Sequence, residues 1–355
     1  MIHSSIARMD VKPRTEDGKY ITSDFVGVVK YLIFQELFNI KQLHTAKFGE
    51  VLICLDKGGP QGYWRKDVHA GYKASRKTGR DVSLVNFGEI FVEIDELIAQ
   101  IQNNLPWKVL SVERAEADDI MLVLAEEYSK HENILIHSPD KDMIQAQRGN
   151  DTVFQYSSLT KKWLVAESKT ESMERWIMEH VCLGDASDEV PKVVDHTEYT
   201  DAFILFLKEN GHPDITTPMD YTAAGMNDVL FEEFPLYKTN NKGESTGVKD
   251  IYKQIRFGPT TLVKKVKEFG TLDKWLDSHP LYRPHYDRNF ILVMSEGIPK
   301  GMRDDILTNY NESKIIYNDR EFIEYLENSG LSNIVMELPS IFKIQRELFA
   351  DDFGW

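Results

Sequence analysis

Three short apolar runs alternate with two longer stretches of helical periodicity between residues 51 and 137. Residues 51–55, 108–112 and 133–137 have the length of buried strands, whereas residues 84–105 and 116–131 carry apolar side chains at helical spacing. Strands and helices in alternation fold as a parallel sheet covered by helices. The sequence therefore predicts an α/β domain with a central, mostly parallel sheet, ending in a hairpin over residues 151–165.

Acidic residues follow each of the three predicted strands. They are Asp56 after the first strand, Glu116, Asp118 and Asp119 after the second, and Asp140 and Asp142 after the third. A further acidic pair, Asp185 and Asp188, lies in the sequence GDASDEVP. Ligands of α/β sheets bind at the carboxyl ends of the strands, so we expect the acids that follow the strands to converge there.

Each acidic group also has an ordinary structural interpretation. Acids favour the first turn of a helix, the sequence SPDKD suits a solvated turn, and GDASDEVP could be just a loop. Their joint recurrence after buried apolar runs favours a metal site instead. Mg²⁺ binds oxygen ligands, and two such ions about 3.5–4 Å apart can act on one phosphodiester.

Length and composition limit the remaining classes of protein. A chain of 355 residues predicts two domains, and 42% hydrophobic content is typical of a globular protein. The sequence shows no signal peptide and no run of 18 uncharged apolar residues, so we expect a cytoplasmic protein without a membrane. Cys54 and Cys182 lie inside apolar runs and are expected to be buried free thiols.

Two basic segments run against the net charge of −15. Residues 57–80 contain seven Lys or Arg against Asp67 alone, and residues 249–267 contain six against Asp250 alone. Local basic patches of this kind can bind phosphate groups even on an acidic protein.

The segments ERAEADDIMLVLAEEY, ILIHSPDKDMIQ and CLGDASDEVP, in this order, resemble the metal-binding motifs of the 5′-nuclease family of flap endonucleases and 5′-3′ exonucleases. The segment VLICLDKGGPQGYWRKDVHAGYKASR is especially similar to phage members with ribonuclease H activity. The resemblance runs, with gaps, from about Ser4 to Leu331. It implies a PIN-like, Rossmann-like nuclease domain with a helical arch, followed by a mainly α-helical DNA-binding domain of the helix-three-turn-helix type.

The resemblance also implies roles for the acidic and basic residues. A first Mg²⁺ would be held by Asp56, Glu116, Asp118, Asp119 and Asp140. A second, bound directly or through water, would be held by Asp142, Asp185 and Asp188, and we expect Mn²⁺ to substitute. Arg65 and Lys73 match basic residues that the family directs at the scissile phosphate, where a cation stabilises developing charge. A generic phosphate contact is the alternative for these two.

DNA-binding roles follow from the same resemblance. Residues 57–80 and the next helix would form the arch beside a single-stranded 5′ end, with Lys66, Arg76 and Lys77 on DNA. Tyr63, Trp64 and Tyr72 would stack on unpaired bases, or simply pack. Residues 257–276 resemble the second half of the helix-three-turn-helix element, where Lys264, Lys265 and Lys267 would bind duplex phosphates; an amphipathic surface helix is the alternative.

The chain departs from the family pattern at three places. The family has an N-terminal strand followed by an aspartate, and this sequence contains neither, so we expect either an upstream start or a missing metal ligand. An insertion of about residues 194–253 separates the GDASDEVP motif from the glycine turn. We place a catalytic domain at 1–169, a DNA-binding domain at 170–338 and a tail at 339–355, whose acidic and aromatic end would dock on a sliding clamp or fray.

Together these features imply a Mg²⁺-dependent 5′-3′ exonuclease and flap endonuclease with ribonuclease H activity. Such a monomer would remove RNA primers and 5′ flaps in phage DNA replication, inside the host cell. Its partners would be DNA and RNA–DNA duplexes with 5′ ends or flaps, the clamp and a single-stranded-DNA-binding protein. One alternative is a flap-binding protein with impaired catalysis. A metal-dependent phosphotransferase is another, but it leaves the basic segments unexplained.

Overall fold

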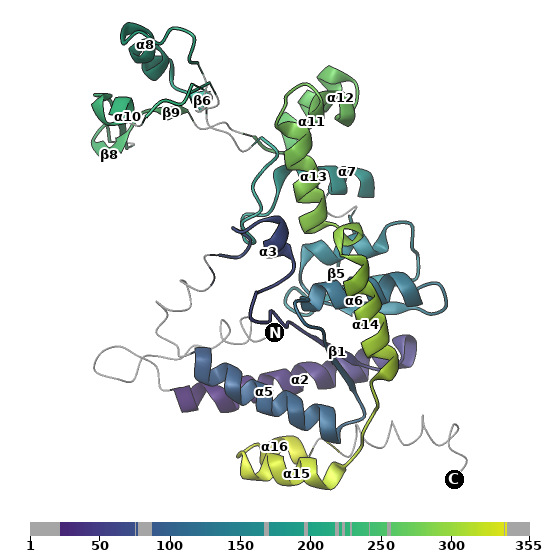
Figure 1. Cartoon of the computed structure of the whole chain (residues 1–355). Coiled ribbons are helices and arrows are strands. Elements are labelled where there is room, and N and C mark those ends of the chain that lie inside the picture. Colours follow the sequence, from purple (N-terminus) through teal and green to yellow (C-terminus); the bar gives the residue numbers. More distant parts are fainter. Residues whose placement is uncertain are drawn as a thin grey trace. The chain divides into compact units, whose positions relative to one another are not determined.

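A computed structural model describes residues 22–74, 76, 87–166, 170–194, 198–216, 220–221, 224–227, 229–240, 242–253, 257–336 and 338 (Figure 1). The chain forms two compact units. Unit 1 comprises Met1–Met178, Ser187–Glu189 and Phe290–Trp355, and unit 2 comprises Glu179–Ala186 and Val190–Asn289. The chain passes between the units within helices α7 (Met173–Leu183) and α13 (Tyr282–Val293). Each unit is described by itself.

Unit 1 contains the predicted alternation of strands and helices. In chain order its first elements are α2 (Thr22–Phe48), β1 (Leu52–Leu55), α3 (Arg65–Val68), α5 (Phe87–Asn104), β2 (Lys108–Ser111), α6 (Ala117–Tyr128) and β3 (Ile134–His137). The three predicted strands and both predicted helices are confirmed, with small shifts at their ends. A 3-10 helix, η1 (Lys141–Gln147), follows β3.

The described strands of unit 1 pair mainly in parallel, as predicted, but they form two separate sheets and not a single central one. β1 pairs with β2 from Leu52↔Lys108 to Leu55↔Ser111, and β3 pairs with β4 (Val153–Ser157) from Ile134↔Val153. The predicted hairpin is also confirmed, because β5 (Lys162–Trp163) pairs antiparallel with β4. Parallel pairing brings the carboxyl ends of neighbouring strands to one edge, where the acidic residues follow.

Two hydrophobic clusters fill unit 1, and both include helices from the C-terminal part of the chain. Phe34 and Leu97 pack with Phe322 of α15 (Asp319–Asn328) in one cluster, and Ile120 packs with Ile306 of α14 (Lys300–Glu312) in the other. A short helix α16 (Ser332–Val335) also contributes. The C-terminal helices therefore fold with the α/β domain, which the predicted boundary near residue 169 did not anticipate.

Unit 2 contains the predicted helical segment at 257–276. It forms α11 (Pro259–Phe269) and α12 (Leu272–Leu276), separated by Gly270 at a φ of 86°. Pro at the first position of α11 and the hydroxyl of Thr271, which accepts from the amide of Lys274 at 3.2 Å, fix the two starts. Phe257 stacks on Trp275 with ring centroids 5.7 Å apart and joins the ends of the segment.

The segment predicted as an insertion builds a hydrophobic core of its own within unit 2. Strands β6 (Glu198–Tyr199) and β9 (Tyr252–Lys253) pair at its base, and it also contains α8 (Asp201–Glu209), α10 (Val229–Glu233), β7 (Tyr237–Thr239) and β8 (Ser245–Lys249). Its buried residues are Tyr199, Phe203, Leu207, Ile215, Tyr221, Phe234 and Ile251.

Several other expectations concern single features. Both cysteines are free thiols; Cys182 is buried and Cys54 half-buried. Among the residues that the structure describes, no helix is long and apolar enough to cross a membrane. The predicted tail at 339–355 and the first 21 residues lie outside the described ranges.

The core of the insertion yields a test of its independence. Phe203 is fully buried, so Phe203→Ala should destabilise this segment by about 3–5 kcal/mol. Amide hydrogen exchange should then show faster exchange at residues 198–253, with unit 1 unchanged. Leu205→Ala on the same helix is the matched control, because Leu205 is 56% exposed. An equal loss of protection in unit 1 would contradict a separate core.

Candidate functional site

The start of helix α6 gathers carboxylates from two strand ends. Asp56 directly follows β1, and its Oδ1 accepts a hydrogen bond from the amide of Ala117 at 2.7 Å. Glu116 is the N-cap of α6 and forms a capping box with Asp119, whose Oδ2 accepts from the amide of Glu116 at 2.9 Å. The helix start thus holds three acids that sequence analysis assigned to one site.

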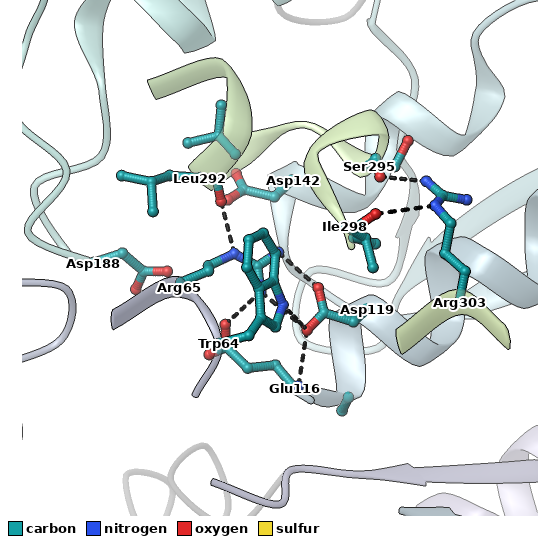
Figure 2. A network of polar contacts seen from close by, with 12 residues as sticks. Trp64, Arg65, Glu116, Asp119, Asp142, Asp188, Leu292, Ser295, Ile298 and Arg303 are labelled. Carbon is teal, nitrogen blue, oxygen red and sulfur yellow. Dashed lines mark hydrogen bonds and ion pairs between the residues drawn. The ribbon is translucent and has the colours of Figure 1, made fainter. Parts of the chain in front are cut away.

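Asp119 is completely buried and is bound by protein donors (Figure 2). Its Oδ2 accepts from Nε1 of Trp64 and from a terminal nitrogen of Arg65, both at 3.0 Å. Its Oδ1 lies 2.7 Å from the other terminal nitrogen of Arg65. Asp119 therefore anchors the start of helix α3.

Arg65 joins Asp119 to two further groups. Its Nε donates to the carbonyl of Leu292 at 2.7 Å, and a terminal nitrogen donates to Oε2 of Glu116 at 2.8 Å. The side chain is only 5% exposed. Burial lowers the pKa of the guanidinium, but Asp119 and Glu116 outweigh burial and leave that pKa raised. Arg65 is therefore a buried, fully charged link between α3, α6 and the end of α13.

Tyr72, Lys73 and Arg76 connect Glu116 to Asp188. The hydroxyl of Tyr72 donates to Glu116 at 2.9 Å and to Asp188 at 3.1 Å. The ammonium of Lys73 pairs with Glu116 and lies 3.2 Å from Asp188, and Arg76 also pairs with Asp188. Lys73 has a φ of 52°, in the left-handed region that is costly for a side-chain-bearing residue. Such strain often accompanies functional sites.

The third acidic group lies in the turn after β3. Asp140 caps η1, and its Oδ1 accepts from the amide of Asp142 at 3.0 Å. The buried amide of Gln155 donates to the carbonyls of Ser138 at 2.9 Å and Asp140 at 2.5 Å. Two side-chain contacts thus hold this turn against the sheet.

The pKa of Asp118 reflects the proximity of the other acids. Burial raises the pKa of its carboxyl group to about 7, with further increases from Asp140, Glu116 and Asp56 and an opposing effect of Lys73. Carboxylates from three strand ends therefore act on one position. Mutual repulsion of this kind is relieved when a cation binds.

Some of the acids in the site are paired with basic side chains. Ion pairs with Arg65, Lys73 and Arg76 fall on Glu116, Asp119 and Asp188. In this arrangement, the described part of the chain contains no group of three or more His, Cys, Asp or Glu side chains set to hold a metal ion. Arg65, Lys73 and Arg76 instead pair with acids that the sequence assigned to metal binding.

Other residues assigned from the sequence have varied surroundings. Trp64 and Tyr72 are buried, whereas Tyr63 and Lys66 are half-buried. Asp185 belongs to unit 2, where its backbone pairs with that of Val190 through hydrogen bonds of 3.0 and 2.8 Å.

On α11, Lys264 and Lys267 are exposed, and Lys265 pairs with Glu268 at 3.0 Å. Lys77 lies outside the described residues, as do residues 78–86, whereas the helix that follows the basic segment in the predicted arch is α5. The DNA-binding assignments therefore stay predictions.

Sequence analysis missed two buried glutamines that hold the Asp140–Asp142 turn. Gln155 lies between Val153 and Ser157 on the inward face of β4, and Gln145 interrupts the apolar residues of η1. Both carried a signal in the sequence, because a polar residue at a buried position requires hydrogen-bond partners.

Part of the chain is similar to known nucleases. Residues 14–177 match the family described as the 5′-3′ exonuclease N-terminal resolvase-like domain. This segment is therefore similar to the N-terminal domain of 5′-3′ exonucleases. Ribonuclease H of Enterobacteria phage T4 is 30% identical over 176 residues, which are 49% of this chain and 56% of the relative. A 5′-3′ exonuclease of Mycoplasmopsis pulmonis (strain UAB CTIP) is 30% identical over 115 residues, 32% of this chain and 35% of that protein.

The matches to these two nucleases span about half and one third of their lengths. A crystal structure of the T5 D15 protein with metal ions shares the fold, with a TM-score of 0.51 and 14% identity over 81% of this chain and 92% of that one. The predicted PIN-like α/β fold with a largely helical remainder is confirmed.

Adjacent acids at the start of α6 should respond oppositely to neutralisation. Asp119→Asn should lower the free energy of unfolding by about 3–5 kcal/mol, because it removes one of the two carboxylates that compensate the buried guanidinium of Arg65. Asp118→Asn should raise it by about 1–2 kcal/mol at pH 8 without metal, since it removes a carboxylate whose raised pKa opposes folding.

The pH dependence gives the sign of the second effect. Ionisation of Asp118 penalises the folded state above the unfolded pKa of about 3.9, and the penalty is complete only above the folded pKa of about 7. The advantage of Asp118→Asn should therefore vanish near pH 4. Urea unfolding with a chelator at both pH values measures it; a gain that persists at pH 4 would contradict this origin.

Proposed function

We propose that this chain is a divalent-metal-dependent 5′-3′ nuclease that hydrolyses phosphodiesters at this site. The observation that carries the proposal is the crowding of Asp56, Glu116 and Asp140 around Asp118, whose pKa rises to about 7. That crowding occurs within a segment similar to the N-terminal domain of 5′-3′ exonucleases. Carboxylates that oppose folding without a cation are expected where a cation is part of the function.

The donor set fits a hard cation, because it consists of carboxylate oxygens. Asp56, Glu116, Asp118 and Asp140 would hold a first Mg²⁺ or Mn²⁺. Asp142, Asp185 and Asp188 would hold a second. Bound divalent ions polarise the phosphodiester and lower the pKa of the attacking water. Asp119 would act through Arg65 and Glu116, since protein donors bind both of its oxygens.

Two basic residues, Lys73 and Arg76, would stabilise the charge that develops on the phosphate during the reaction. Lys73 and Arg76 neutralise Glu116 and Asp188 in the structure, so their charges lie next to the proposed metal ligands. A phosphate brought to those ligands would come within their reach, and a preorganised cation there stabilises the charge of the transition state. Arg65 is too buried for this role and instead fixes the orientation of Glu116.

The substrates we propose are DNA and RNA–DNA duplexes with 5′ ends or flaps, as in primer removal during phage replication. A relative named ribonuclease H supports the RNA–DNA substrate. The exposed Lys264 and Lys267 of α11 would bind duplex phosphates. Docking of residues 339–355 on a sliding clamp and contact with a single-stranded-DNA-binding protein belong to the same proposal.

Neutralising a proposed metal ligand tests the reaction. Asp140→Asn and Asp56→Asn should each slow cleavage of a labelled 5′ flap in Mg²⁺ by about 100-fold or more, because each removes a group that stabilises the transition state. Binding of the same flap, measured by fluorescence anisotropy with Ca²⁺ in place of Mg²⁺, should persist.

Asp151→Asn is the control, because Asp151 is an exposed acid just before β4. Unchanged cleavage in either ligand variant would refute the assignment. A wild-type protein that binds the flap but yields no product in Mg²⁺ or Mn²⁺ would instead support the binding-only alternative.

A further inference from the structure

We infer that Gln145 is a positioning residue for the proposed nuclease reaction and sets the place of the Asp140–Asp142 turn. The inference rests on the proposed function of that turn in metal binding. Gln145 lies in η1, three residues after Asp142, and its side chain is 5% exposed. It would act through Asp142 and would not touch the substrate.

Three hydrogen bonds fix the amide of Gln145. Its Nε2 donates to the carbonyl of Asp142 at 2.8 Å and to the carbonyl of Val293 at 2.9 Å. Its Oε1 accepts from the amide of Ser295 at 2.7 Å. Both donor hydrogens and one acceptor position are used, and buried amide groups that lose such partners are costly. The side chain therefore has one geometry available.

The contact to Val293 connects Gln145 to the C-terminal end of α13, which Arg65 also contacts. The last carbonyls of a helix lack intrahelical donors, and Leu292 and Val293 are the last residues of α13. Gln145 binds the carbonyl of Val293. Arg65 binds the neighbouring carbonyl of Leu292 (Figure 2). These contacts span 148 and 227 residues of sequence.

The C-terminal end of α13, at Leu292 and Val293, is thus bound to two acidic groups of the site. Through Arg65 it fixes Glu116 and Asp119 at the start of α6. Through Gln145 it fixes the backbone of Asp142. The separation between the carboxylates proposed for the first ion and Asp142, proposed for the second, depends on both links.

Gln155 makes the expected effect selective. It holds the carbonyls of Ser138 and Asp140 from the side of β4, independently of Gln145. Loss of the Gln145 amide should therefore release Asp142 more than Asp140. Metal binding should weaken, while the first part of the turn keeps its place.

Gln145→Met tests the inference, because it keeps the length of the side chain and removes all three hydrogen bonds. The Mg²⁺ concentration for half-maximal cleavage of a labelled 5′ flap should rise about 10-fold, as is usual when a partner of a metal ligand is lost. The rate at saturating Mg²⁺ should recover to within a few fold of wild type. Binding of Mn²⁺ without DNA, measured by calorimetry, should weaken to a similar degree.

Gln147→Met is the matched control on the same helix. Gln147 donates to the carbonyl of Leu164 at 2.9 Å, on the side of the hairpin and not to the Asp140–Asp142 turn. Its variant should lose some thermal stability but keep the wild-type Mg²⁺ midpoint within about twofold. A metal effect specific to Gln145 therefore separates positioning from a general loss of packing.

Equal Mg²⁺ midpoints and equal Mn²⁺ affinities in the two variants would overturn the inference. If Gln145→Met does not fold, Gln145→Asn replaces it, since the shorter amide keeps its chemistry but misplaces its hydrogen bonds; a wild-type metal response there would also overturn the inference. Failure of the proposed function looks different, because wild-type protein would then show no metal-dependent cleavage at all.

Discussion

The buried guanidinium of Arg65 is the interaction on which the rest of the site depends. A charge that is 5% exposed persists only when its surroundings compensate it, and Arg65 has two carboxylates and a backbone carbonyl for this purpose. These partners come from α6 and from the end of α13. Because the fork of an arginine is planar and rigid, satisfying it also fixes the relative orientation of these elements.

This compensation divides the acids of the site into two kinds. Glu116, Asp119 and Asp188 are neutralised by basic side chains of the chain itself. Asp118 has its pKa raised by burial and by neighbouring carboxylates, so its surroundings supply too little positive charge. The neutralised acids Glu116, Asp119 and Asp188 thus lie beside Asp118, whose ionised form a bound cation would stabilise. Metal binding at the proposed site would therefore be coupled to folding.

The sequence was sufficient to predict the α/β alternation, its parallel pairing and the edge at which the acids gather. Periodicity and strand length carry that information locally. It was insufficient for Arg65, Trp64 and Tyr72, which belong to a basic, aromatic segment that suggested a nucleic-acid surface but are buried. Their burial depends on partners such as Leu292, which lies 227 residues away from Arg65. The pattern of residues within a short segment cannot reveal a contact with a residue so far away in the sequence.

The same charges explain how an acidic protein can present a phosphate-binding site. With a net charge of −15, the chain as a whole repels nucleic acid, yet Lys73 and Arg76 lie directly against the proposed metal ligands. Cations bound at the proposed site would compete with Lys73 for Glu116 and with Arg76 for Asp188. The basic side chains would then be available to a phosphate at the same place, so one set of residues can balance the empty and the loaded site.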